Sequence, residues 1–257
     1  MKLIYYFFGK ILKIKKLLFK KTHLEYAGPY KDWETAKYNS TGYDSDVVLK
    51  KIVNSVNEVL SGKKKYERDG TSFDNLPAHN TLIQTLQKLS IYDKTIVDFG
   101  GSLGSNYINY LNFFSKNVKK YLVVEQKNIC DLGNKISESN NFSLEFLESI
   151  EEIDEKIDII ICSSSLQYIE KWKEVVQKII DKSPEHILID RHPLTNKETK
   201  IFVQLNTGYY DKPVTYPIHI INEEEFLIAF KNYQCVKKWN SDFDPDYFKG
   251  FHLKKIN

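Results

Sequence analysis

Short apolar runs alternate with stretches of helical periodicity from residue 94 onward. The apolar runs have the length of strands and lie at 95–98, 121–125, 143–147, 157–162 and 186–190. Stretches with apolar residues at helical spacing lie among them, at 105–115, 128–139 and 171–181. Continuous apolar runs are typical of strands buried on both faces. The pattern therefore predicts an α/β fold with a mostly parallel, Rossmann-like sheet and right-handed helical crossovers.

The regular alternation stops after residue 200. The sequence predicts a short extra strand at 201–205 and a helix over 222–231, which Asn222 can cap. Two aromatic strands follow, at 233–239 and 247–254, with a polar turn between them. This order predicts an antiparallel hairpin at the C-terminal end of the sheet.

The region before residue 90 has a helical pattern. One helix is predicted from about Asp44 to Gly62 and a second over 78–89, with a polar connection between them. We expect residues 22–90 to form a helical cap, either as a lid or packed on the sheet edge. Residues 91–257 are then expected to form the ligand-binding domain, because no repeat or low-complexity linker divides them.

The charge is concentrated at the N-terminus. Residues 1–21 hold seven lysines and no acidic residue, and Ile4, Phe7, Ile11 and Leu18 share one helical face. The segment is too short and too charged to span a bilayer and lacks a signal-peptide cleavage site. It is expected to lie on an anionic membrane surface or, alternatively, to pack on its own domain or on a second copy in a homodimer.

The rest of the chain has the opposite charge. Because the whole chain carries +3 and residues 1–21 carry +7, residues 22–257 carry −4. This balance disfavours binding of nucleic acid through the release of counterions. The three cysteines have neither paired nor metal-ligand spacing, so we expect reduced thiols, no bound metal and a cytoplasmic location.

A glycine-rich turn follows the first strand of the predicted sheet. The strand ends at Asp98, and glycines permit positive φ and close approach of a ligand to the backbone. Phe99 stands where a dinucleotide-binding turn has its first glycine. An acidic residue suits the cationic groups of S-adenosyl-L-methionine (SAM) and would repel a pyrophosphate. The residues expected to bind SAM at this turn are Asp98, Gly100, Gly101, Ser102 and Gly104.

Two later strand ends complete the predicted cofactor site. Glu125, followed by Gln126, ends the second strand at the distance from the turn where an acid binds both ribose hydroxyls. This feature suits SAM and NAD equally, since both contain a ribose. Ser163 and Ser164 follow the fourth strand and are expected beside the methionine half of SAM.

Several motifs together resemble a family of bacterial class I SAM-dependent methyltransferases found among surface-polysaccharide genes. The motifs are Trp33, 42–44, 67–70, Phe73, 97–105, 164–168, 189–193, 203–204 and 216–217. The resemblance runs from about residue 30 to the end. It implies a Rossmann-like methyltransferase fold and methylation of a small capsule or lipopolysaccharide building block, at a sugar hydroxyl or a phosphate-type oxygen. His192 departs from the family pattern, which has a small hydroxyl residue there.

The predicted acceptor site lies at the end of the fifth strand. His192 is expected to act as a base beside Asp190 and Tyr168, although a loop histidine without a role is an equal alternative. Arg68 and Arg191 are expected to bind an anionic or sugar group, and an ion pair between Arg68 and Asp69 is the alternative. Further expected acceptor contacts are Asp69, Gln167, Gln204, Tyr216 and His219.

Two other functions fit parts of the sequence. An NAD-dependent sugar oxidoreductase or epimerase would use the same sheet, but its usual Tyr-x-x-x-Lys pair is missing after the fourth strand. A membrane-associated scaffold without catalytic activity would not need Asp98, the glycines and Glu125 together.

Overall fold

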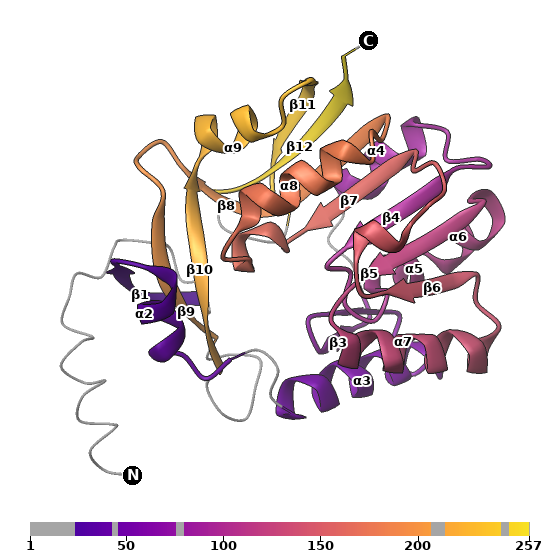
Figure 1. Cartoon of the computed structure of the whole chain (residues 1–257). Coiled ribbons are helices and arrows are strands. Elements are labelled where there is room, and N and C mark those ends of the chain that lie inside the picture. The colour runs from indigo at the N-terminus through magenta and orange to yellow at the C-terminus, as the bar shows by residue number, and fades with distance from the viewer. Residues whose placement is uncertain (1–23, 43–45, 76–79, 207–213, 243–246, 257) are drawn as a thin grey trace.

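A computed structural model describes residues 24–42, 46–75, 80–206, 214–242 and 247–256. The basic segment 1–21, and with it the membrane and dimer hypotheses, lies outside these residues. Within them, no helix combines the length and the apolar character needed to cross a membrane. The fold is α/β, with a mostly parallel central sheet (Figure 1).

Five parallel strands form the centre of the sheet, as the sequence predicted. They are β4 (Thr95–Phe99), β5 (Lys120–Val124), β6 (Leu144–Leu147), β7 (Ile159–Ser163) and β8 (His186–Thr195). The C-terminal hairpin, β11 (Tyr233–Asn240) and β12 (Phe248–Lys255), is also confirmed. Because β12 pairs antiparallel with β8, the order across the sheet is β6-β5-β4-β7-β8-β12-β11.

Side chains alternate between two cores, one on each face of the sheet. Val97 of β4 packs on the face covered by α8 (Trp172–Asp181) and α9 (Glu223–Ala229). Its neighbour Ile96 points to the other face, which is covered by α4 (Thr81–Lys88), α5 (Ser105–Asn109), α6 (Leu111–Asn117) and α7 (Lys127–Asn140). The helix predicted over 105–115 is thus two helices, because the backbone leaves the helical region at Tyr110.

A second group of strands extends the sheet beyond β8. It comprises β1 (Leu24–Tyr30), β9 (Lys200–Asn206) and β10 (Val214–Asn222), which are paired antiparallel with β9 in the middle. Only Ile221 and Asn222 of β10 pair with β8. These strands lie at the left of Figure 1, with helix α2 (Trp33–Tyr38) beside them. The sequence predicted β9 but neither β1 nor β10.

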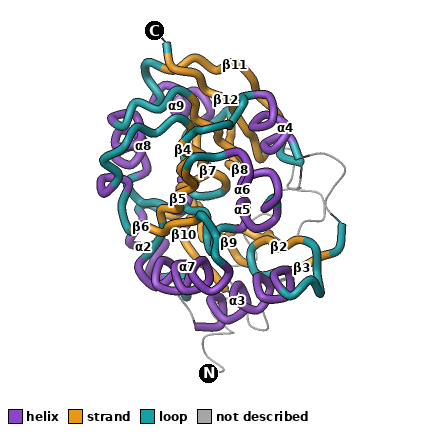
Figure 2. The backbone as a smooth tube through the Cα atoms, turned by 90° about the vertical axis from the view of Figure 1, so that its right-hand side faces the viewer, coloured by secondary structure: helices purple, strands orange, loops and turns teal. Residues whose placement is uncertain are grey.

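The region between α2 and the sheet contains strands as well as helices. Helix α3 (Asp46–Leu60) packs against a hairpin, β2 (Tyr66–Arg68) and β3 (Thr71–Phe73), where the sequence indicated a polar connection (Figure 2). Asp69 and Gly70 form its turn with φ of 51° and 78°. Asp-Gly is the residue pair that such a positive-φ hairpin turn prefers.

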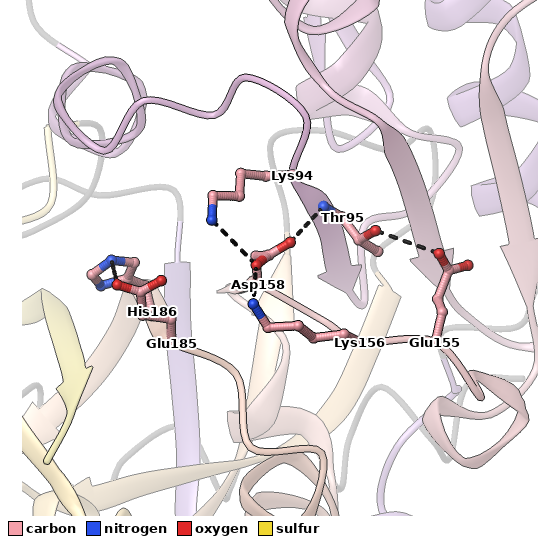
Figure 3. A network of polar contacts seen from close by, with 7 residues as sticks. All are labelled: Lys94, Thr95, Glu155, Lys156, Asp158, Glu185 and His186. Carbon is pink, nitrogen blue, oxygen red and sulfur yellow. Dashed lines mark hydrogen bonds and ion pairs between the residues drawn. The ribbon is translucent and has the colours of Figure 1, made fainter. Parts of the chain in front are cut away.

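An ion-pair network closes the amino ends of β4 and β7 (Figure 3). The Asp158 carboxylate accepts hydrogen bonds from the Thr95 backbone N–H at 3.0 Å, from Lys156 at 2.9 Å and from Lys94 at 3.4 Å. Burial alone would raise the pKa of Asp158, but these donors together lower it. The negative charge of Asp158 at this edge of the sheet is therefore balanced by the two lysines.

Candidate functional site

The glycine-rich turn lies at the carboxyl edge of the sheet, between β4 and α5. Gly100, Ser102 and Gly104 have φ of 73°, 53° and 81°. The Gly100 N–H donates to the Val124 carbonyl at 2.9 Å, which ties the turn to the end of β5. A Cβ added to Gly101 would lie 2.7 Å from Asp98 Cγ, so the residue beside this carboxylate has to be glycine.

Asp98, the penultimate residue of β4, is almost fully buried, with 1% of its surface exposed. Its Oδ2 accepts hydrogen bonds from Tyr121 Oη at 2.9 Å and Asn106 Nδ2 at 3.0 Å. Its Oδ1 is buried with no hydrogen-bond partner among the described residues. Burial raises the pKa of Asp98 to about 6, although the two hydrogen bonds oppose this shift. A buried carboxylate oxygen of this kind requires a donor or a cation from a ligand.

Glu125 holds the other side of the turn. It follows β5, and its Oε1 accepts a hydrogen bond from the Ser102 backbone N–H at 3.1 Å. Its Oε2 accepts one from the backbone N–H of Gln126, the residue that begins α7, at 3.0 Å. These two hydrogen bonds fix the orientation of the carboxylate at the carboxyl edge of the sheet.

A cavity opens over this turn and reaches the β2–β3 hairpin. Nine of the predicted site residues line it: Arg68, Asp69, Asp98, Gly100, Gly101, Ser102, Ser163, Asp190 and Arg191. Eight further lining residues were missed: Glu67, Phe73, Asn80, Leu82, Ser105, Asn106, Asn109 and Tyr110. Glu67 and Phe73 belong to motifs that the sequence had already singled out. The pair Asp69-Gly70 is the signal from which their hairpin could have been predicted. Asn106 and Asn109 follow the glycine turn on α5, and Asn80 caps α4, but none of the three has a distinctive spacing in the sequence.

An ion pair crosses the cavity between the hairpin and β8. Arg191 Nη2 lies 2.9 Å from Asp69 Oδ2. Both residues have positive φ, 58° for Arg191 and 51° for Asp69. Asp69 thus bonds to Arg191, and the nearby Arg68, which the sequence had suggested as its partner, also helps to lower the pKa of Asp69. Asp190, the acidic residue of β8, accepts a hydrogen bond from Trp239 Nε1 at 2.9 Å.

A bulge in β8 explains how Arg191 reaches the cavity. His192 pairs with Lys249 of β12 and Ile189 pairs with Phe251, so Asp190 and Arg191 both stand opposite Gly250. A bulge changes the face to which the following side chains point.

The bulge places His192 in the core, which contradicts its expected role as a base. The ring is fully buried and does not line the cavity. Its Nδ1 lies 2.8 Å from the Asp190 carbonyl, and its Nε2 accepts the Leu166 N–H at 3.3 Å. Burial lowers the pKa of His192 to about 4. With both ring nitrogens occupied, His192 holds the loop after β7 against β8 and has no nitrogen to offer a substrate.

The loop after β7 contains the short helix η2 (Leu166–Tyr168), and several of its polar side chains bond within the protein, whereas Ser165 Oγ and Gln167 Oε1 are buried without a partner among the described residues. Ser164 Oγ accepts a hydrogen bond from Gln167 Nε2 at 2.9 Å, and Tyr168 Oη lies 3.4 Å from Gln204 Oε1. Gln204 Nε2 donates to Tyr216 Oη at 3.0 Å. These residues pack β9 and β10 against η2 and, like Gly104, Glu125 and Gln126, are not among those lining the cavity.

His219 lies apart from the cavity as well. Its ring stacks on Trp33 at a centroid distance of 4.6 Å, and its Nε2 lies 3.2 Å from the Glu170 carbonyl. Gln204, Tyr216 and His219 thus lie outside this cavity, where the β1–β9–β10 strands pack on α2 and the loop after β7, and their contacts with an acceptor stay a prediction.

Solved structures share this fold at low sequence identity. No protein-family model matches the sequence, and neither does any curated protein. The CcbJ methyltransferase from Streptomyces caelestis superposes with a TM-score of 0.52 at 7% identity, over 68% of this chain and 89% of that one. A SAM-dependent methyltransferase from Clostridium acetobutylicum gives 0.50 at 12% identity, with the same two coverages, 68% and 89%. The fold is that of SAM-dependent methyltransferases. At these identities the likeness concerns the fold alone.

Proposed function

We propose that the protein is a SAM-dependent methyltransferase acting on a small molecule. The proposal rests on Asp98, whose buried Oδ1 lacks a partner among the described residues, inside a cavity bounded by a glycine turn. An ammonium group placed there would satisfy this oxygen and compensate the buried charge. Two observations make the site suitable for SAM. One is this oxygen, and the other is the close approach of the Gly101 backbone to the Asp98 carboxylate, which leaves no room for a side chain between them.

The residues of the turn have distinct roles in this proposal. Asp98 accepts hydrogen bonds from the amino group of the methionine half, and Glu125 accepts those of the ribose hydroxyls. The backbone at Gly100 and Gly101 lets the ligand approach without a side chain in the way. Ser163, at the end of β7, lines the cavity beside them.

SAM supplies a methyl group activated by its sulfonium sulfur. The protein therefore has to hold an acceptor in line with the methyl carbon and exclude water, since methyl transfer is an in-line displacement. The hairpin residues Arg68 and Asp69, with Asp190 and Arg191 of β8, form the polar wall of the cavity opposite the turn. We assign the acceptor to this wall. The family resemblance favours a surface-polysaccharide building block with an oxygen acceptor, in the cytoplasm.

Calorimetric titration of the full chain with S-adenosylhomocysteine, SAM and NAD tests the proposal. We expect both sulfur-containing ligands to bind at least tenfold more tightly than NAD, which corresponds to about 1.4 kcal/mol. Gly101→Ala should abolish this preference because its Cβ would displace the Asp98 carboxylate. Gly62→Ala is the control for an added Cβ, because no atom lies within 4 Å of it; its φ of 74° makes this substitution more demanding on the backbone than the one at Gly101, which has no positive φ. Tighter binding of NAD would overturn the proposal.

A further inference from the structure

A second buried carboxyl group lies in the same cavity, on the β2–β3 hairpin. Glu67 has none of its surface exposed, yet it lines the cavity together with Asp98 and the glycine turn. Its Oε2 accepts a hydrogen bond from Ser55 Oγ of α3 at 3.2 Å. Its Oε1 is buried without a hydrogen-bond partner among the described residues.

The protein fixes the position of Glu67 through its backbone. The Glu67 N–H donates to Asn109 Oδ1 at 2.9 Å, and Asn109 Nδ2 donates to the Glu67 carbonyl at 2.7 Å. This pair of bonds attaches β2 to the end of α5, the helix that follows the glycine turn. The hairpin is therefore held in register with the cofactor turn, and the side chain of Glu67 is held in the cavity between them.

Folding gains nothing from leaving this oxygen unpartnered. Burial of a carboxyl group without compensation costs free energy, and a glutamine or an apolar residue would fill the same space more favourably. Burial raises the pKa of Glu67 to about 7, and the nearby Asp69 adds to this shift, while the hydroxyls of Ser105 and Ser55 oppose it. A carboxyl group with such a pKa can exchange a proton near neutral pH.

We infer that Glu67 is a catalytic residue that accepts the proton of a neutral hydroxyl group on the acceptor. This inference rests on the proposed function and narrows its acceptor class. As the acceptor oxygen bonds to the methyl carbon, the carbon–sulfur bond breaks and its electron pair stays on sulfur. The hydroxyl proton moves to the carboxylate of Glu67. Atoms and charge balance without any other reactant.

The charges around the cavity favour an alcohol over a phosphate as the acceptor. Four acidic residues, Glu67, Asp69, Asp98 and Asp190, line the cavity together with the two cations Arg68 and Arg191. A phosphate oxygen is already ionised and needs no base, and the carboxylate of Glu67 would repel it. A hydroxyl group can donate a hydrogen bond to Oε1 and thereby satisfy this buried atom.

Sinefungin provides a probe that does not require the acceptor to be known. In this analogue, a carbon bearing an amino group replaces the methyl-bearing sulfur, so a cation occupies the place from which the methyl group is transferred. S-Adenosylhomocysteine has no group there. If Glu67 faces that place, its carboxylate should favour sinefungin over S-adenosylhomocysteine.

The measurement is the ratio of the two dissociation constants in the full chain, determined by calorimetry at pH 8. Glu67→Gln should reduce the preference for sinefungin by roughly tenfold and leave the affinity for S-adenosylhomocysteine unchanged. Glu58→Gln is the matched control: Glu58 bonds to Ser72 of the same hairpin and to Lys63 but does not line the cavity. An equal change for both ligands, or none, would overturn the inference.

The wild-type chain gives an independent test that does not depend on folding of the variant. The preference for sinefungin should fall as the pH is lowered from 8 to 5.5, because Glu67 becomes protonated. Asp98 affects both ligands equally, since both have the same amino-acid end. The other charged groups on elements packed around Glu67 are Lys51 and Glu58 of α3, Arg68 and Asp69 of the hairpin, and Asp190 and Arg191 of β8.

The outcomes separate the two proposals. A chain that fails to bind S-adenosylhomocysteine contradicts the methyltransferase proposal itself. A chain that binds it, with a preference for sinefungin that is independent of pH, contradicts only the role of Glu67.

Discussion

Two buried aspartates at opposite ends of adjacent strands differ in their hydrogen-bond partners and in the direction of their pKa shifts. Asp98, the penultimate residue of β4, has one oxygen without a hydrogen-bond partner among the described residues, whereas Asp158 precedes β7 and accepts hydrogen bonds from a backbone N–H and two lysines. Both are buried, at 1% and 8% exposure. The pKa of Asp98 is raised to about 6, and that of Asp158 is lowered. At the amino edge, the carboxylate of Asp158 is thus compensated by groups of the protein. At the carboxyl edge, the carboxylate of Asp98 has an oxygen that a ligand can bond.

The largest effect is expected for Asp98→Asn. The substitution keeps the size of the side chain but removes the charge that the ammonium group of the ligand requires. The affinity for S-adenosylhomocysteine should fall by about 2–5 kcal/mol, as measured by calorimetry. The free energy of unfolding should stay the same or rise, because a buried charge without compensation is removed. A large loss of stability with unchanged affinity would contradict the comparison.

The matched substitution at the other edge, Asp158→Asn, should have the reverse effect. Because the substitution removes the negative charge that Lys94 and Lys156 share and one of the two acceptor oxygens, denaturant unfolding should show a loss of about 1–3 kcal/mol. The affinity for S-adenosylhomocysteine should not change. The lowered pKa of Asp158 gives stability above its unfolded-state pKa, which is lost as the pH falls through the folded-state value. This acid-dependent loss should be smaller in the variant.

Ligand binding should depend on pH through Asp98. Below its pKa of about 6, the free protein holds a proton that the ligand must displace. The affinity for S-adenosylhomocysteine should decrease by up to about tenfold per pH unit from there downward. The stability of the free protein should have the opposite trend over the same range, because a raised carboxyl pKa favours the folded state at low pH. Asp98→Asn should remove both dependences.

The smallest effect is expected for Asp69→Asn, at the carboxyl edge but with 48% of its side chain exposed. Solvent screens its ion pair with Arg191, so the free energy of unfolding should change by less than about 1 kcal/mol. The affinity for S-adenosylhomocysteine should change by less than about threefold. A larger loss of affinity would show that position at this edge, rather than burial, determines the role of an acidic residue.

The parallel sheet was predictable because each of its strands has a recognisable pattern in the local sequence. The run around Ile159–Ser163 is apolar without interruption, and the turn after Asp98 has its glycines in place. Strands β1 and β10 have no such signal, since each contains a proline and is paired mainly with β9. A proline is tolerated in β10 because the strand is bonded on both sides only near Ile221 and Asn222.

The role of His192 could not be predicted for a different reason. Its place after the apolar run suggested an exposed strand end, but β8 continues to Thr195. The bulge opposite Gly250 depends on β12, some 60 positions later in the chain, and it decides which side chain points inward. The backbone conformation of the glycine turn was predictable because its requirement is local. Glu67 is buried by Ser55 and Asn109, and neither contact has a signature in the sequence.

The pairing of β1 with β9 also bears on how this chain acquires its shape during synthesis. Leu24 stands opposite Asn206, so the first described strand can pair only after residues about 180 positions downstream have been synthesised. Until the ribosome has released that partner, the N–H and carbonyl groups of β1 that β9 will bond remain open to water or to neighbouring chains. Translation can thus complete β4 to β8 first and add the pairing of β1 with β9 afterwards, when the two distant stretches of the polypeptide meet.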